Sequence, residues 1–73
     1  MSRIRLMTAR EVEAILTRYG FQLISQKGSH RKWRQELLGL QVIVPLHKGR
    51  TIPVGTLRSI FQGAKIPESE WRI

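Results

Sequence analysis

The chain has no cysteine, no aspartate, only two histidines and no long apolar run, and each shortage excludes a class of protein. Without cysteine there are no disulfides and no thiolate zinc site, which fits a cytoplasmic protein. Two histidines without aspartate are too few for the usual structural metal sites. No segment approaches the roughly 18 apolar residues of a membrane span, and residues 1–7 lack the apolar core of a signal peptide. We therefore expect no metal, no cofactor and no membrane partner.

The length predicts a single domain over residues 1–73, with no linker or low-complexity stretch to divide it. A chain this short buries only about 60% of the surface that its unfolded form exposes. That leaves no room for a deep cavity, so we expect any chemistry on the surface or in a shallow groove.

Positive charge dominates the composition and is concentrated in one stretch. Thirteen Lys and Arg residues against five acids give a net charge of +8. Between residues 27 and 50 the single acid is Glu36. This asymmetry favours a polyanionic partner such as RNA or DNA, although basic residues also serve solubility or dock an acidic protein. The cations of this stretch are Lys27, Arg31, Lys32, Arg34, Lys48 and Arg50.

Capping residues and apolar spacing predict an α+β domain. Thr8 and Glu11 form a capping box, and apolar residues at helical spacing follow it as far as Gly20. β-rich segments bounded by glycine turns then predict three strands. The predicted elements are a helix at 9–19, strands at 21–26, 30–35 and 40–45, a helix ending near Gly63 and a helical turn at 67–71. We expect a three-stranded antiparallel sheet with both helices packed on one face, which leaves the other face basic and wet.

The heptad from Lys27 to Trp33, Lys-Gly-Ser-His-Arg-Lys-Trp, contains the main candidate for catalysis. Imidazole is the side chain that titrates nearest to neutral pH, so His30 suits proton transfer beside a phosphodiester. The nearby groups that would neutralise phosphate are the Lys27, Arg31 and Lys32 cations and the Gly28 and Ser29 amides. The alternative is that His30 only packs or binds phosphate. Ser29 is not a predicted nucleophile, because no carboxylate lies nearby to complete a triad.

Strand alternation separates these side chains. His30, Lys32 and Arg34 share one face of the predicted strand, and Arg31 and Trp33 share the other. We expect Trp33 to lie in the core, although an exposed tryptophan would stack on a nucleic-acid base.

His47 is the second imidazole, in a loop beyond the third predicted strand. An antiparallel meander would bring this loop near the end of the sheet that carries His30. His47 is therefore a candidate auxiliary acid or base, and the alternative is that it binds phosphate or fixes the loop.

Several segments, in this order along the chain, closely resemble the HicA family of bacterial type II toxins. They are Thr8-Ala-Arg-Glu-Val, Gly20-Phe21, Gln26-Lys-Gly-Ser-His30, Val44-Pro45 with His47, and Gly55-Thr-Leu-Arg-Ser-Ile60. The Gly-Ser-His and Gly-Thr-Leu-Arg-Ser-Ile segments, at their mutual spacing, are the specific ones. One departure is Leu37-Leu38, in a turn that is usually polar in the family. These two residues mark either a partner contact or a longer hairpin.

The resemblance implies a double-stranded-RNA-binding-domain-like fold and a metal-independent mRNA interferase whose essential histidine is His30. It also implies a HicB-type antitoxin that covers the His30 face. We expect an RNA track formed by Lys27, Gly28, Ser29, Arg31, Lys32, Arg34, Lys48 and Arg50. The alternative is a non-catalytic RNA-binding module of the same fold.

Overall fold

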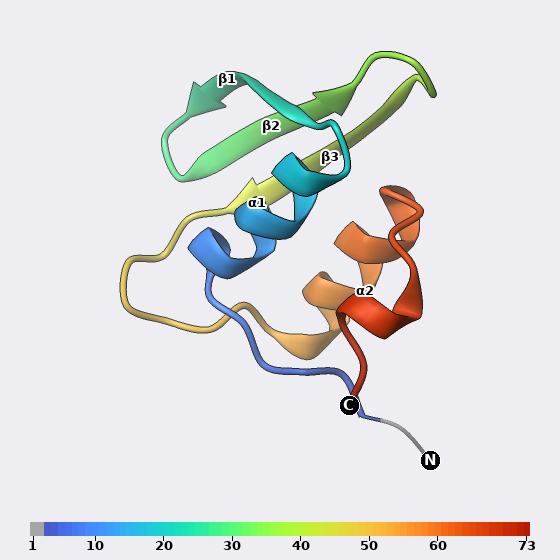
Figure 1. Cartoon of the computed structure of the whole chain (residues 1–73). Coiled ribbons are helices and arrows are strands. Elements are labelled where there is room, and N and C mark those ends of the chain that lie inside the picture. Colours follow the sequence, from blue (N-terminus) through green and yellow to red (C-terminus); the bar gives the residue numbers. More distant parts are fainter. Residues whose placement is uncertain (1–2) are drawn as a thin grey trace.

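The secondary structure follows the predicted order α-β-β-β-α (Figure 1). The computed structural model describes residues 3–73, so the first two residues of the N-terminal segment considered above lie outside it. The elements are α1 (Ala9–Arg18), β1 (Gln22–Lys27), β2 (His30–Gln35), β3 (Leu40–Pro45), α2 (Val54–Gly63) and a short 3-10 helix, η1 (Glu68–Glu70).

Helix α1 begins at the predicted capping box. The Thr8 hydroxyl accepts from the Glu11 backbone N–H at 3.3 Å, and the Glu11 carboxylate accepts from the Thr8 N–H at 2.8 Å. These two bonds satisfy groups that a helix start otherwise leaves unpaired. The helix ends before Gly20, whose φ of +84° suits glycine. The predicted capping of this helix is therefore confirmed.

The three strands form an antiparallel meander with β2 in the centre. Trp33 lies opposite Leu23 of β1 and opposite Val42 of β3. Because directly opposite residues point to the same side of a sheet, this register fixes which side chains share a face.

Strand β1 begins one residue later than predicted and contributes no buried side chain. Phe21 is buried just before the strand, but all six residues of β1 are exposed. Ile24 is an extra residue in the pairing with β2, which makes a β-bulge between Leu23 and Ser25. The tertiary contacts of α1 and α2 with the sheet are made mainly to β3, so β1 extends beyond the helices.

Both helices lie on the same side of the sheet, as predicted (Figure 1). Trp33 is only 8% exposed, so the predicted core position of this tryptophan is confirmed. The rings of Phe61 and Trp71 stack with centroids 5.5 Å apart. The core between the layers includes Leu16, Trp33, Val42, Val44, Leu57, Phe61 and Trp71.

Candidate functional site

His30 is the first residue of β2 and follows a tight turn at Gly28-Ser29. Gly28 has a φ of +59°, a conformation that glycine adopts without strain. The side chain of His30 is exposed, and within residues 3–73 its ring has no hydrogen-bond or ion-pair partner. The imidazole is therefore held on a paired backbone and is open to a ligand.

The open face of the sheet carries the predicted polar side chains. His30, Lys32 and Arg34 lie on it, because the alternate residues of β2 are on the helix side. The register places Lys27 directly opposite His30, and Ser25 opposite Lys32. This face therefore brings His30 together with two lysines, as the sequence predicted.

The six cations of residues 27–50 fall into two groups. Arg31 is paired with Glu13 and Arg34 is paired with Glu36. The other four have no ion pair within the part of the chain that the structure describes: Lys27, Lys32, Lys48 and Arg50. These four are the cations that can neutralise phosphate without breaking an existing pair.

Arg31 lies on the helix side of β2, in a half-buried polar cluster. Its Nε donates to the Glu13 carboxylate at 2.6 Å, and the Trp33 Nε1 donates to the same oxygen at 2.8 Å. A further Arg31 nitrogen donates to the Gln26 side chain at 2.9 Å. The cluster ties α1 to the strand that begins with His30.

Glu13 was missed by the sequence reasoning, although a signal exists. Its position follows Val12 and precedes Leu16 by three residues, so helical spacing places Glu13 on the apolar face of α1. A buried carboxylate needs a partner, and an arginine followed by a tryptophan two residues later on a neighbouring strand supplies two donors.

His47 lies in the loop between β3 and α2, at the same end of the sheet as His30. The Leu46 N–H donates to the Ser29 carbonyl at 2.6 Å, and Pro45 lies opposite His30. This arrangement bears out the expected placement of the loop. His47 is exposed and follows Leu46 directly.

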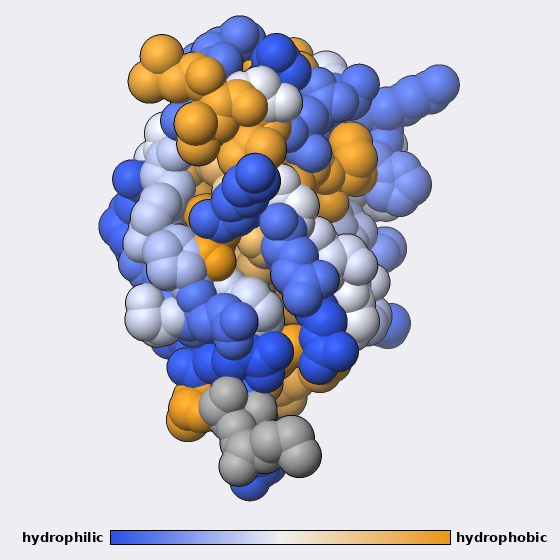
Figure 2. Space-filling model, turned by 90° about the vertical axis from the view of Figure 1, so that its right-hand side faces the viewer, coloured by the Kyte–Doolittle hydropathy of each residue, from blue (hydrophilic) through white to orange (hydrophobic). Residues whose placement is uncertain are grey.

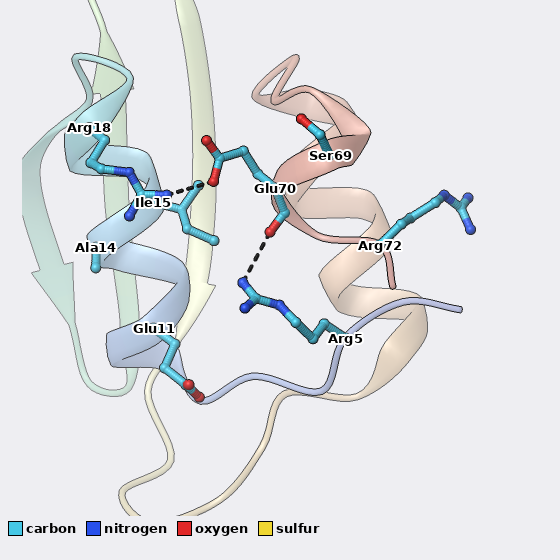
Figure 3. A pocket seen from close by; sticks show the side chains of 8 residues that line it. All are labelled: Arg5, Glu11, Ala14, Ile15, Arg18, Ser69, Glu70 and Arg72. Carbon is cyan, nitrogen blue, oxygen red and sulfur yellow. Dashed lines mark hydrogen bonds and ion pairs between the residues drawn. The ribbon is translucent and has the colours of Figure 1, made fainter. Parts of the chain in front are cut away.

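A cavity of about 410 Å³ lies between α1 and the C-terminal segment (Figure 3). None of the residues between 27 and 50 is among those that line it. The Glu70 carboxylate accepts from Arg18 at 2.6 Å and from the Tyr19 hydroxyl at 2.7 Å. The Glu70 carbonyl oxygen accepts from Arg5 at 3.0 Å. The Tyr19 hydrogen bond is the main cause that lowers the pKa of Glu70 below 4.5. These contacts fasten the C-terminal segment to α1.

The tip of the β2–β3 hairpin exposes two leucines. Leu37 is 93% exposed and Leu38 is 67% exposed. Figure 2 shows apolar surface at the top of the molecule, at the level of this hairpin. The tip lies at the end of β2 away from His30, so it does not belong to the basic site.

Within residues 3–73, no three histidine or acidic side chains come together as a metal site would require. In the same part of the chain, neither helix has the length and apolar character needed to cross a membrane.

Comparison of the sequence with known proteins gives a match to one family model. The family model described as the HicA toxin of bacterial toxin–antitoxin systems matches residues 9–66, which include both histidines and all six cations of the basic stretch. Curated proteins gave no match to the chain.

Proposed function

Because the chain belongs to the HicA toxin family of bacterial toxin–antitoxin systems, we propose that it is a metal-independent endoribonuclease that cleaves mRNA in the cytoplasm. The single observation that carries this proposal is the exposed imidazole of His30 beside unpaired lysines on an open sheet face. The family membership supports the toxin role, and the geometry supports the chemistry.

The proposed reaction uses the ribose 2′-hydroxyl as the nucleophile. His30 removes the 2′ proton as the 2′ oxygen attacks phosphorus, and the bond from phosphorus to the 5′ oxygen breaks. The leaving oxygen takes a proton from the imidazolium, or from water, and the product ends in a 2′,3′-cyclic phosphate. A positioned acid or base contributes about 10²–10⁴ in rate, and no metal ion is needed for these proton transfers.

Lys27 and Lys32 are the proposed partners of His30 at the phosphate. Lys27 lies opposite His30 in the register, and Lys32 is the next residue on the same face of β2. Ammonium groups near the developing negative charge stabilise the transition state. Arg34, Lys48 and Arg50 extend the proposed RNA track, together with the Gly28 and Ser29 amides. The role of Arg31 at phosphate remains a prediction, because its guanidinium already bonds Glu13 and Gln26.

The family implies an antitoxin partner, and we propose that a HicB-type antitoxin covers the His30 face. A bound antitoxin would prevent RNA from binding because it would contact the same unpaired cations. An inhibitor that neutralises this face needs acidic groups opposite Lys27 and Lys32.

The test is cleavage of a long single-stranded RNA in EDTA by the wild-type chain and by His30→Ala. We expect cutting by the wild type and at least a 100-fold slower rate in the variant, with RNA binding and the circular dichroism spectrum unchanged. An RNA with a 2′-O-methyl group at each cut site is the matched substrate control and should resist cleavage.

Cutting by His30→Ala at the wild-type rate would contradict the role of His30. RNA binding without cutting by either protein would leave a non-catalytic RNA-binding module. One observation favours that second function: within residues 3–73 no side chain hydrogen-bonds the His30 ring to orient it.

A further inference from the structure

A groove lies beside the His30 end of the sheet, between the start of α1 and the loop that follows β3. It encloses about 480 Å³, within the range of about 300–1,000 Å³ that is typical of sites for small organic ligands. One side is formed by Thr8, Ala9 and Arg10, and the other by Leu46, His47 and Lys48.

The loop that forms one wall is fixed at both ends. At its start the Leu46 N–H donates to Ser29, and at its end the Ile52 N–H donates to the Met7 carbonyl at 2.8 Å. Between these points the Arg50 N–H donates to the His47 carbonyl at 3.0 Å, which closes a turn. The groove is therefore formed before any ligand binds, so binding does not have to order the loop.

The groove lies at the end of the sheet that carries His30, round that end from the open face, because one of its walls is the start of α1. Pro45, directly opposite His30 in the sheet, is followed at once by the groove residue Leu46. Leu46 is bonded to Ser29, the residue before His30. A polymer whose phosphate faces His30 reaches this groove by passing round the end of the sheet where Leu46 bonds Ser29.

The side chains in the groove match the parts of a nucleotide. The half-buried Leu46 offers apolar contact to a base, and the exposed imidazole of His47 offers a stacking surface. Arg10 and Lys48 offer cations to a phosphate, and no acidic side chain lines the groove. An acidic peptide would use the cations but would leave the apolar and imidazole surfaces without a matching group.

We propose that this groove binds the single-stranded ribonucleotide next to the phosphate that faces His30, a proposal that rests on the proposed nuclease function. His47 contacts the base and Lys48 contacts the neighbouring phosphate. His47 is then a specificity-determining residue, and the groove sets which nucleotides flank the cut.

Binding is tested by NMR titration of the whole chain with the four 5′-ribonucleoside monophosphates and, separately, with inorganic phosphate. We expect the nucleotides to shift the signals of groove residues, with unequal affinities among the four bases. Phosphate should shift Lys48 and Arg10 but leave Leu46 unchanged. Nucleotide shifts confined to Lys27 and Lys32, or spread evenly over every lysine, would overturn the groove as a binding site.

Function is tested by the kinetics of a defined oligoribonucleotide. Lys48→Ala should raise KM about tenfold, the expected cost of losing a charge-assisted contact, with kcat within about threefold of wild type. The matched control is Arg58→Ala, which removes an exposed cation from α2, away from the groove. His47→Ala should change the base preference beside the cut.

The outcomes separate this proposal from the nuclease itself. Equal KM values for Lys48→Ala and Arg58→Ala, in a wild type that cleaves, would overturn the groove and remove Lys48 from the RNA track, but would leave the role of His30 intact. Absence of wild-type cleavage with nucleotide shifts in the groove would overturn the nuclease and support the nucleotide site.

Discussion

The two faces of β2 carry similar residues that have opposite surroundings. Arg31 is half-buried on the helix side, where its Nε lies 2.6 Å from the Glu13 carboxylate. Lys32, the next residue, lies on the open side without an ion pair in the described chain. Neighbouring cations in one basic run therefore have different tasks: one connects a helix to the strand, and the other remains available to a polyanion.

The number of basic residues in a sequence is therefore larger than the number of cations that are free to bind a polyanion. Two of the six cations between residues 27 and 50 are already paired with carboxylates, and both of them are arginines. The lysines of this stretch remain unpaired within residues 3–73. Arginine suits a fixed pair because its planar guanidinium holds a carboxylate in a defined geometry.

Removal of Glu13 should have the largest effect on stability. Glu13→Ala leaves the Arg31 guanidinium and the Trp33 indole without their acceptor in a mostly buried site. We expect the free energy of unfolding to fall by about 2–4 kcal/mol, measured by urea denaturation. Glu13→Gln, which keeps an acceptor but loses the charge, should cost less.

The matched control is Glu36→Ala, which breaks the Arg34 pair on the other face. Glu36 is 75% exposed in its side chain, and exposed pairs contribute about 0–1 kcal/mol. Equal losses in Glu13→Ala and Glu36→Ala would show that the two faces do not differ in the way described.

The paired and unpaired cations should also differ in RNA binding. Lys32→Ala should weaken binding severalfold at low salt, with no loss of stability, and should reduce the slope of log affinity against log salt by about one. Arg31→Ala should mainly lower stability, with a smaller change in the affinity of the folded protein. A larger salt-slope change for Arg31→Ala than for Lys32→Ala would reverse this assignment.

The smallest effect is expected from pH, at the cavity between α1 and the C-terminal segment. The pKa of Glu70 is lowered, chiefly by the Tyr19 hydroxyl and also by Arg18. A carboxyl with a lowered pKa stabilises the fold above its unfolded-state pKa, and this contribution is lost as the pH falls through the lower folded-state value. Wild type and Glu70→Gln should therefore differ in thermal stability at pH 7 and converge in acid, as the pH falls through the lowered folded-state pKa of Glu70. A difference that persists unchanged in acid would contradict this cause.

Sequence patterns were sufficient to predict the elements with strong local signals. The capping box at Thr8 and the alternation of His30 and Trp33 each depend on neighbours a few residues away, so spacing alone placed them. Contacts between distant parts were not predictable in the same way. Glu13 and Arg31 meet only because α1 packs on β2, and the groove forms only where the loop after β3 lies beside the start of α1. The exposure of β1 depends on how far the helices extend over the sheet. Local sequence patterns do not predict that extent.

The extra residue at Ile24 also bears on how the chain avoids self-association. β1 is an edge strand, and its six exposed residues would offer a template for a strand of another copy. The bulge interrupts the regular spacing of the edge, and Lys27 adds a charge at the end of the strand. Irregular, charged edges resist sheet extension. The open sheet face is thus bordered by an edge that resists the addition of a strand from another copy.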